Sequence, residues 1–331
     1  MFQKSVLSVL SFLTIIFAQT GNPVPKKILS DLKDKKELVR YKALIDLAEM
    51  VTENQVDPQK AIPLIVEAFK DSERSVSIGA TRSLGSLAGK EETFPYILEA
   101  LKHKDVSVRI EIIRILGEVG GDKIVAPISD TLKNDTSKDV RYAAMREIVK
   151  ITEQEDKRVG LQFVDFLLER LNSDKKLGGR FGFIEALSNL CSETKKPLPT
   201  LLEIFKSDPE DKIRSISAKA LGEIGPDAKE ISPLMFERIK NKKEAAMVRA
   251  SIAVALMKIE EDSTEVIAIL VEMVKEADEG VVRGALEGLR YAGSQGKEAI
   301  TTITKIIEKK GKNAALAEET YMAITNQRFP R

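Results

Sequence analysis

The feature that most constrains this chain is a motif that recurs along almost its whole length. In each copy an aliphatic residue is followed by Arg, with small or apolar residues four, eight and eleven places after the first. One copy consists of Val108-Arg109, Ile112, Leu116 and Val119. Because these spacings fall on one face of an α-helix, each copy predicts an amphipathic helix.

The copies return at intervals that suit a pair of helices. Their second positions are residues 40, 77, 109, 141, 180, 214, 249, 282 and 317, which gives steps of 32 to 39 residues. Another amphipathic stretch lies between copies, as at 61–69, and glycines follow the patterned helices at 89, 120, 225 and 293, where a positive φ stops a helix. We therefore predict an all-α fold, an α-solenoid of about nine stacked helical hairpins over residues 26–325.

Prolines and acids recur in register with this motif. The prolines lie in the first helix of their repeats, at positions 63, 95, 127, 199 and 233. Six residues before the second position stand Asp34, Asp71, Asp135, Asp174 and Asp208, and His103 takes this place in the third repeat. We expect each Asp to cap the second helix and to accept from the Arg of its own turn, so that Asp135 meets Arg141 and the pairs stack between repeats.

This combination of paired helices with proline, Asp and Arg in register resembles the HEAT-repeat family, particularly the short bacterial type also called PBS-lyase HEAT-like. The resemblance covers about residues 26–325. It implies a scaffold built from a solenoid, and it implies little about activity.

The first 18 residues have the layout of a secretory signal peptide. Lys4 precedes an apolar run from Val6 to Phe17, and Ala18 suits a cleavage site before Gln19. The alternative is a buried first helix or an uncleaved anchor. We predict a signal peptide at 1–18, a short linker at 19–25 and a C-terminal tail at 326–331. The mature chain is then periplasmic or secreted and has no stable membrane span.

Charge and chemistry disfavour several classes of function. There are 52 Lys and Arg residues against 51 Asp and Glu, without the basic excess typical of nucleic-acid binders. His103 is the only histidine and Cys191 the only cysteine, so sites that need two of either are excluded. Cys191 stands among apolar residues and is predicted to be a small buried hydrophobe. We therefore predict no enzyme and no cofactor, with a carboxylate-based hydrolase or lyase as the alternative.

The candidate binding surface follows from the helical wheel. The residue two places after the first residue of each motif points nearly opposite the buried positions. It is expected to face solvent on the inner curve. In the first five repeats this place holds Tyr41, Ile78, Ile110, Tyr142 and Phe181. Six places after the first residue of the motif, repeats two to four carry Arg82, Arg114 and Arg146. This stripe predicts a protein or peptide partner with acidic and apolar residues. The alternative is that these side chains pack against neighbouring helices. The sequence gives no indication of the oligomeric state.

Overall fold

The computed structural model describes residues 22–173, 177–260 and 262–329, and regular structure in these ranges is entirely helical. The described residues divide into two compact units, one ending at Glu147 and the other beginning at Ile148. The predicted signal peptide lies outside the described residues, as do Asp174 and the last two residues of the predicted tail. Within the described ranges, no helix has the length and apolar character needed to cross a membrane.

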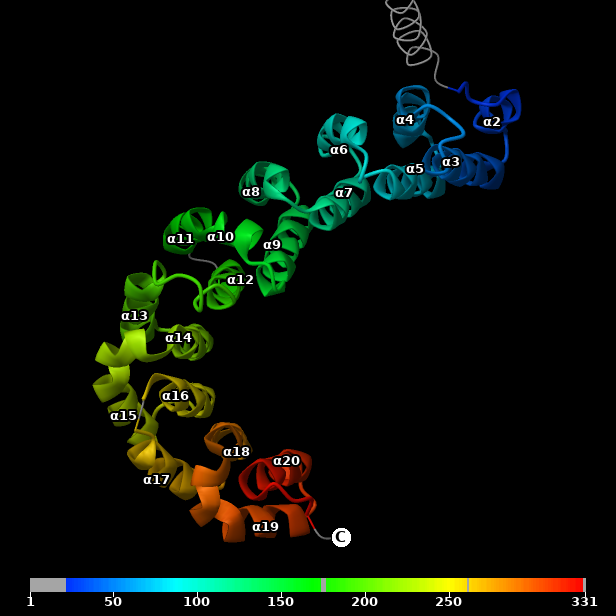
Figure 1. Ribbon diagram of the computed structural model, residues 1–331. Coiled ribbons are helices and arrows are strands. Elements are labelled where there is room, and N and C mark those ends of the chain that lie inside the picture. The colour runs from blue at the N-terminus through cyan, green and yellow to red at the C-terminus, as the bar shows by residue number, and fades with distance from the viewer. Residues whose placement is uncertain (1–21, 174–176, 261, 330–331) are drawn as a thin grey trace, which may run out of the picture. The chain divides into compact units, whose positions relative to one another are not determined.

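The first unit is a stack of helical hairpins. Its helices are α2 (Lys26–Asp31), α3 (Glu37–Thr52), α4 (Pro58–Glu67), α5 (Arg74–Ser86), α6 (Phe94–Ala100), α7 (Val106–Val119) and α8 (Val125–Asn134). The unit boundary falls inside α9 (Lys138–Glu153). The patterned helices form one layer, in which α3 packs on α5 and α5 on α7, and α4, α6 and α8 form the other (Figure 1).

The second unit repeats this plan. Its helices are α10 (Arg158–Leu161), α11 (Val164–Ser173), α12 (Leu177–Ser188), α13 (Leu198–Ser207), α14 (Asp211–Ile224), α15 (Ser232–Lys240), α16 (Ala246–Ile259), α17 (Thr264–Met273), α18 (Glu279–Ala292), α19 (Ile300–Glu308) and α20 (Ala314–Thr325). The layer of α12, α14, α16, α18 and α20 lies on the inner side of the curve that this unit forms (Figure 1). The predicted all-α solenoid is thus confirmed.

The core is built from the positions that the motif marks as buried. In α16, Val248, Ile252 and Leu256 have no exposed surface, and Ile259 is equally buried. Glycines at 120, 225 and 293 have φ values of 65°, 73° and 55°, as predicted for helix ends. Gly89 has no positive φ; it stands three residues beyond the end of α5, which stops at Ser86.

The Arg and Asp residues form a series of ion pairs between consecutive repeats, which we call the ladder. The predicted Arg partner of each Asp, the Arg of its own repeat, is wrong. Asp135 accepts from Arg109 of the preceding repeat, whose Nε and Nη2 lie 2.8 and 2.9 Å from the two carboxylate oxygens. Arg141 donates instead to the backbone carbonyl of Asp135, at 2.7 Å. An extended Arg side chain therefore satisfies its own turn with one nitrogen and crosses to the next repeat with the others. Among the described residues the pairs between repeats are Arg40–Asp71, Arg109–Asp135, Arg180–Asp208, Arg214–Glu244 and Arg249–Glu276.

The Asp side chains do not cap the second helices as predicted; they stabilise the turns that precede them. Asp34, Asp71, Asp135 and Asp208 each accept from the backbone N–H two residues later, before the helix begins. The hydrogen bond from Arg40 lowers the pKa of Asp71. Burial opposes this effect at Asp135, but hydrogen bonds from Arg109 and the Ser137 N–H still bring its pKa below the usual value. The carboxylates of Asp71 and Asp135 are therefore held ionised.

One rung of the ladder has different chemistry. Between the second and third repeats, Ser77 stands in the Arg position and His103 in the Asp position. The Nδ1 atom of His103 accepts from the Asp105 N–H at 3.1 Å, and its Nε2 lies 2.7 Å from the Phe69 carbonyl oxygen. Ser77 donates to the same carbonyl at 3.2 Å. His103 therefore replaces both the turn-forming carboxylate and the contact between repeats.

Candidate partner-binding groove

Three of the five stripe residues are only partly exposed. Tyr41 lies so close to α5 that a Cβ atom added at Gly79 would be 2.6 Å from its ring. Its hydroxyl accepts from Arg82 Nη1 at 3.2 Å. Ile78 and Ile110 are half-buried. These three residues are thus less exposed than the expectation of a solvent-facing position implies, and for Tyr41 the cause is its contact with α5 of the neighbouring repeat.

The three arginines do not form a uniform row. Arg114 binds Glu111 and Glu118 on its own helix, and its hydrogen bond lowers the pKa of Glu111. The charge of Arg114 is thus already neutralised. Arg82 and Arg146 are exposed. A row of three arginines equally available to a ligand is therefore absent from this surface.

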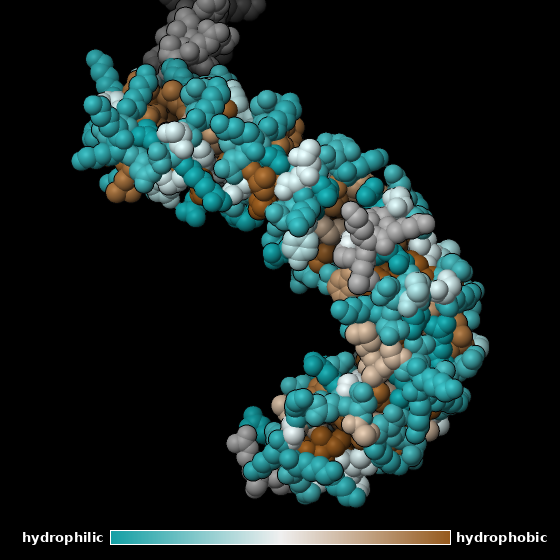
Figure 2. Space-filling model, turned by 180° about the vertical axis from the view of Figure 1, so that it is seen from behind, coloured by the Kyte–Doolittle hydropathy of each residue, from teal (hydrophilic) through white to brown (hydrophobic). Residues whose placement is uncertain are grey.

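Two stripe residues are exposed as expected. Tyr142 on α9 is 67% exposed and belongs to the first unit, and Phe181 on α12 is 40% exposed and belongs to the second. On the face drawn in Figure 2, hydrophilic atoms dominate and apolar atoms gather in small areas. Of the two exposed rings, Phe181 lies beside a cavity.

This cavity is an open groove of about 500 Å³ on the inner layer of the second unit. Side chains of α12, α14 and the start of α16 line it: Phe181, Glu185, Ser188, Asn189, Lys212, Ser215, Ile216, Lys219 and Met247. Met247 is 42% exposed, so two large apolar side chains meet solvent here. Asn189 donates from Nδ2 to the Thr152 hydroxyl at 3.1 Å, which holds its amide in place. We call this cavity the α12–α14 groove.

Small residues explain why the groove opens at this step of the stack. Farther along the layer, helices approach backbone to backbone: a Cβ atom added at Gly222 would be 2.8 Å from the Ala255 Cα. At Gly284, the distance to the Ala250 Cα would be only 2.3 Å. The steps from α14 to α16 and from α16 to α18 are therefore tightly closed along these contacts. At the step from α12 to α14 the groove remains open, and the exposed ring of Phe181 forms part of its lining.

The groove carries two ammonium groups and one carboxylate. Lys212 and Lys219 are exposed, and within the described ranges neither has an ion pair. Glu185 lines the opposite wall on α12. The nearby Arg180 and Arg214 are already paired with Asp208 and Glu244. The local field of the groove is thus set mainly by the two lysines.

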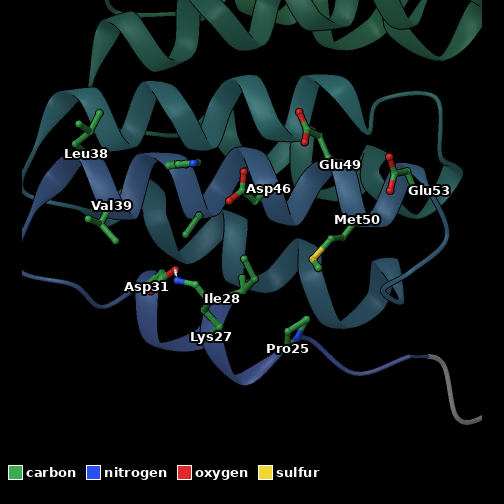
Figure 3. Close-up of a pocket in the computed structure, with 12 residues that line it drawn as sticks. Pro25, Lys27, Ile28, Asp31, Leu38, Val39, Asp46, Glu49, Met50 and Glu53 are labelled. Atoms are coloured by element: carbon green, nitrogen blue, oxygen red, sulfur yellow. Dashed lines mark hydrogen bonds and ion pairs between the residues drawn. The ribbon is translucent and has the colours of Figure 1, made fainter.

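A second cavity lies at the outer face of the first described hairpin. Its volume is about 640 Å³, and it is enclosed by α2 and α3 (Figure 3). Ile28 and Met50 form part of its lining, while Asp46, Glu49 and Glu53 follow α3 along one side (Figure 3). Solenoids need polar outer faces on their terminal repeats. Asp46, Glu49 and Glu53 give this face charged groups, beside an apolar lining that includes the exposed Leu38.

Comparison with known proteins settles the family. The family model for HEAT repeats matches residues 94–188 and 198–290, which is more than half of the chain. The chain belongs to the HEAT-repeat family. No curated protein matches the sequence.

Solved structures show the same HEAT architecture. The chain is similar to Kap95p from a structure with RanGDP, with a TM-score of 0.57 and 14% identity over 90% of this chain and 46% of Kap95p. It is also similar to Kap121p bound to Pho4p (TM-score 0.57, 14% identity, 90% and 41% coverage) and to Kap121p bound to Ste12p (0.58, 13%, 90% and 41%). The chain spans less than half the length of these proteins. At such identities the likeness concerns the fold.

The remaining chemistry of this HEAT-repeat chain is sparse. Cys191 is buried as predicted; burial, and to a lesser extent the charge of Glu223, raises the pKa of its thiol to about 12. Its Sγ donates to the Leu187 carbonyl at 3.2 Å. His103 is engaged in the ladder. Among the described residues, no group of three or more His, Cys, Asp or Glu side chains is placed to hold a metal ion.

Sequence reasoning missed most of the groove. Lys212 and Met247 each stand one residue before the first residue of their motifs. Lys219 stands six places after the first residue of its motif, Ile213. The helical-wheel prediction includes the residue six places after the motif's first residue only where it is Arg. It does not include the residue that precedes the motif. A search for exposed residues on both sides of each motif start would have found all three.

Proposed function

We propose that this protein is an exported, non-catalytic scaffold that holds a protein or peptide partner on the inner, second-helix face of its solenoid. The observation that carries the proposal is the α12–α14 groove, where Phe181 and Met247 expose large apolar side chains beside unpaired lysines. Binding interfaces concentrate their energy in a few such anchors. Kap121p bound to Pho4p or Ste12p is a HEAT solenoid that binds other proteins, which supports a protein partner here.

The alternative, a carboxylate-based hydrolase or lyase, gains no specific support from the groove. Hydrolysis by paired carboxylates needs two acidic side chains facing one bond. Among the residues that line the α12–α14 groove, Glu185 is the single carboxylate. We therefore keep binding as the proposed function, with no cofactor and no nucleic-acid partner.

Affinity capture tests the binding proposal. The chain from Gln19 onward is immobilised and exposed to an envelope extract, in parallel with a variant carrying Phe181→Ser and Met247→Ser. The control carries Tyr291→Ser and Met322→Ser, two residues of similar exposure, 59% and 47%, outside the groove. We expect a protein that is retained by the wild type and the control but lost from the groove variant. Equal capture by all three chains would contradict the proposed site.

Export is tested separately. Mass spectrometry of the native protein is expected to find an N-terminus at or near Gln19 in an envelope or secreted fraction. The proposal rests on Lys4, the apolar run and Ala18. An intact Met1 in the cytoplasmic fraction would contradict export and leave the binding proposal standing.

A further inference from the structure

We propose that the α12–α14 groove binds a short peptide segment that combines one large apolar side chain with acidic residues. This inference rests on the proposed function and specifies its partner. It depends on the arrangement of apolar and charged side chains along the groove.

The groove has an apolar end. Phe181, Ile216 and Met247 all lie in the first half of their helices, and these helices are neighbours in the inner layer. Ile216 is almost fully buried, while the other two are about 40% exposed. An apolar side chain of the partner that enters between them removes exposed ring and thioether surface from water. This end is therefore suited to a single anchor residue.

The two lysines flank the apolar residue Ile216 along α14. Lys212 stands beside the apolar residues, and Lys219 lies seven residues later on the same helix, about 10 Å along its axis. An extended peptide advances about 3.3 Å per residue. Acidic residues two to four places apart can therefore reach both ammonium groups. Ser188 and Asn189 line the far part of the groove and add polar contacts.

The sign of the field selects acidic over basic partners. Two ammonium groups face one carboxylate, Glu185, and nearby arginines are neutralised by their ladder partners. A basic peptide would be repelled by Lys212 and Lys219, whereas an acidic one would be attracted in a salt-dependent manner. The groove thus combines an apolar anchor site with a net positive wall.

Selection from a phage-displayed library of random dodecapeptides tests this inference on the chain from Gln19 onward. We expect enriched peptides to contain a large apolar residue with Asp or Glu within four places of it. Their affinity, measured by fluorescence anisotropy, is expected to fall about tenfold or more with Lys212→Glu and Lys219→Glu together. Glu185→Lys is expected to strengthen binding several-fold. The matched control is Lys297→Glu with Lys305→Glu, two exposed lysines outside the groove.

The outcomes separate this inference from the proposed function. Enriched peptides that lack acids, or that ignore the reversal of Lys212 and Lys219, overturn the inference while leaving a binding scaffold in place. If no peptide is enriched and no captured protein depends on Phe181, both proposals fail. Circular dichroism checks that each variant is folded. Should the double reversal unfold the chain, Lys212→Gln with Lys219→Gln removes the same charges, and unchanged affinity there overturns the inference.

Discussion

The ladder between repeats makes a quantitative prediction, because two aspartates differ in only one contact. Asp34 and Asp135 each accept from a backbone N–H two residues later, at 2.8 Å in both cases. Asp135 additionally binds Arg109, and both side chains of this pair are only 9% exposed. Asp34 has no such pair among the described residues. Alanine at each position therefore separates the turn contact from the ion pair.

The expected magnitudes follow from these contacts. Asp34→Ala removes one hydrogen bond of the turn and should cost about 1 kcal/mol. Asp135→Ala also leaves Arg109 buried without its carboxylate. Removing one partner of a buried pair costs about 3–5 kcal/mol. Because Arg109 Nη1 keeps the His103 carbonyl at 2.7 Å, we expect the lower end of that range, about 3 kcal/mol in total.

Native-state hydrogen exchange, read by mass spectrometry, measures these costs locally. Solenoid repeats contact only their neighbours, so the amides of α7 and α8 report on the Arg109–Asp135 pair. The cost of Asp34→Ala is read instead from the amides of α2 and α3. Relative to the wild type, about 1 kcal/mol corresponds to roughly fivefold faster exchange there, and about 3 kcal/mol to roughly 150-fold faster exchange in α7 and α8 of Asp135→Ala. Adding Arg109→Met to Asp135→Ala should recover most of the loss. Equal costs for the two single variants, or no recovery in the double variant, would refute the interpretation.

The same pair fixes the sign of the pH dependence. The folded pKa of Asp135 is lowered, so its stabilising effect is fully present above the unfolded value of about 3.9. It is lost as the pH falls through the folded pKa. After correction for the intrinsic, pH-dependent rate of amide exchange, the protection of α7 and α8 is thus expected to decrease below about pH 4 in the wild type and to change less in Asp135→Ala.

Three further predictions concern other positions. Ser77→Arg with His103→Asp should rebuild the ladder and raise stability by about 1 kcal/mol in urea denaturation, whereas His103→Asp alone should lower it; a double variant less stable than either single would contradict this. Gly284→Val should lower stability by about 3 kcal/mol, visible as a lower Tm, because its Cβ would overlap Ala250. Cys191 should resist iodoacetamide at pH 8 until the protein is denatured, since it is buried with a raised pKa; rapid labelling of native protein would disprove this.

The fold could be predicted from the sequence because the same hydrophobic pattern recurs in every repeat. One copy of the motif fits many helical proteins, but copies in register specify stacked hairpins. The predicted ladder has the right Arg residues, but its connection is wrong, and two of its acids are Glu244 and Glu276 where only Asp was expected. Sequence spacing places Asp135 and Arg141 in one turn. It carries no information on how far an extended Arg side chain reaches into the next repeat.

The binding surface was less predictable for a related reason. A helical wheel gives the direction of a side chain relative to its own core, and it ignores the neighbouring repeat. Tyr41 and Phe181 occupy the same motif position, yet Tyr41 is covered because Gly79 leaves room for its ring. Phe181 keeps 40% of its surface exposed. The residue that faces a given position across the stack decides its exposure, and this requires coordinates.

The contacts that close the rest of the inner layer also prepare the groove for binding. Arg180–Asp208 and Arg214–Glu244 connect α12, α14 and α16 at the turns, while Gly222 brings α14 and α16 into backbone contact. A partner therefore meets walls whose helices are already fixed in register. Association costs less when few groups must be ordered on binding. Arg214 and Glu244 are not among the residues that line the groove. Substituting this pair should nevertheless lower the affinity of a groove ligand. That result distinguishes a preformed groove from one that the ligand shapes.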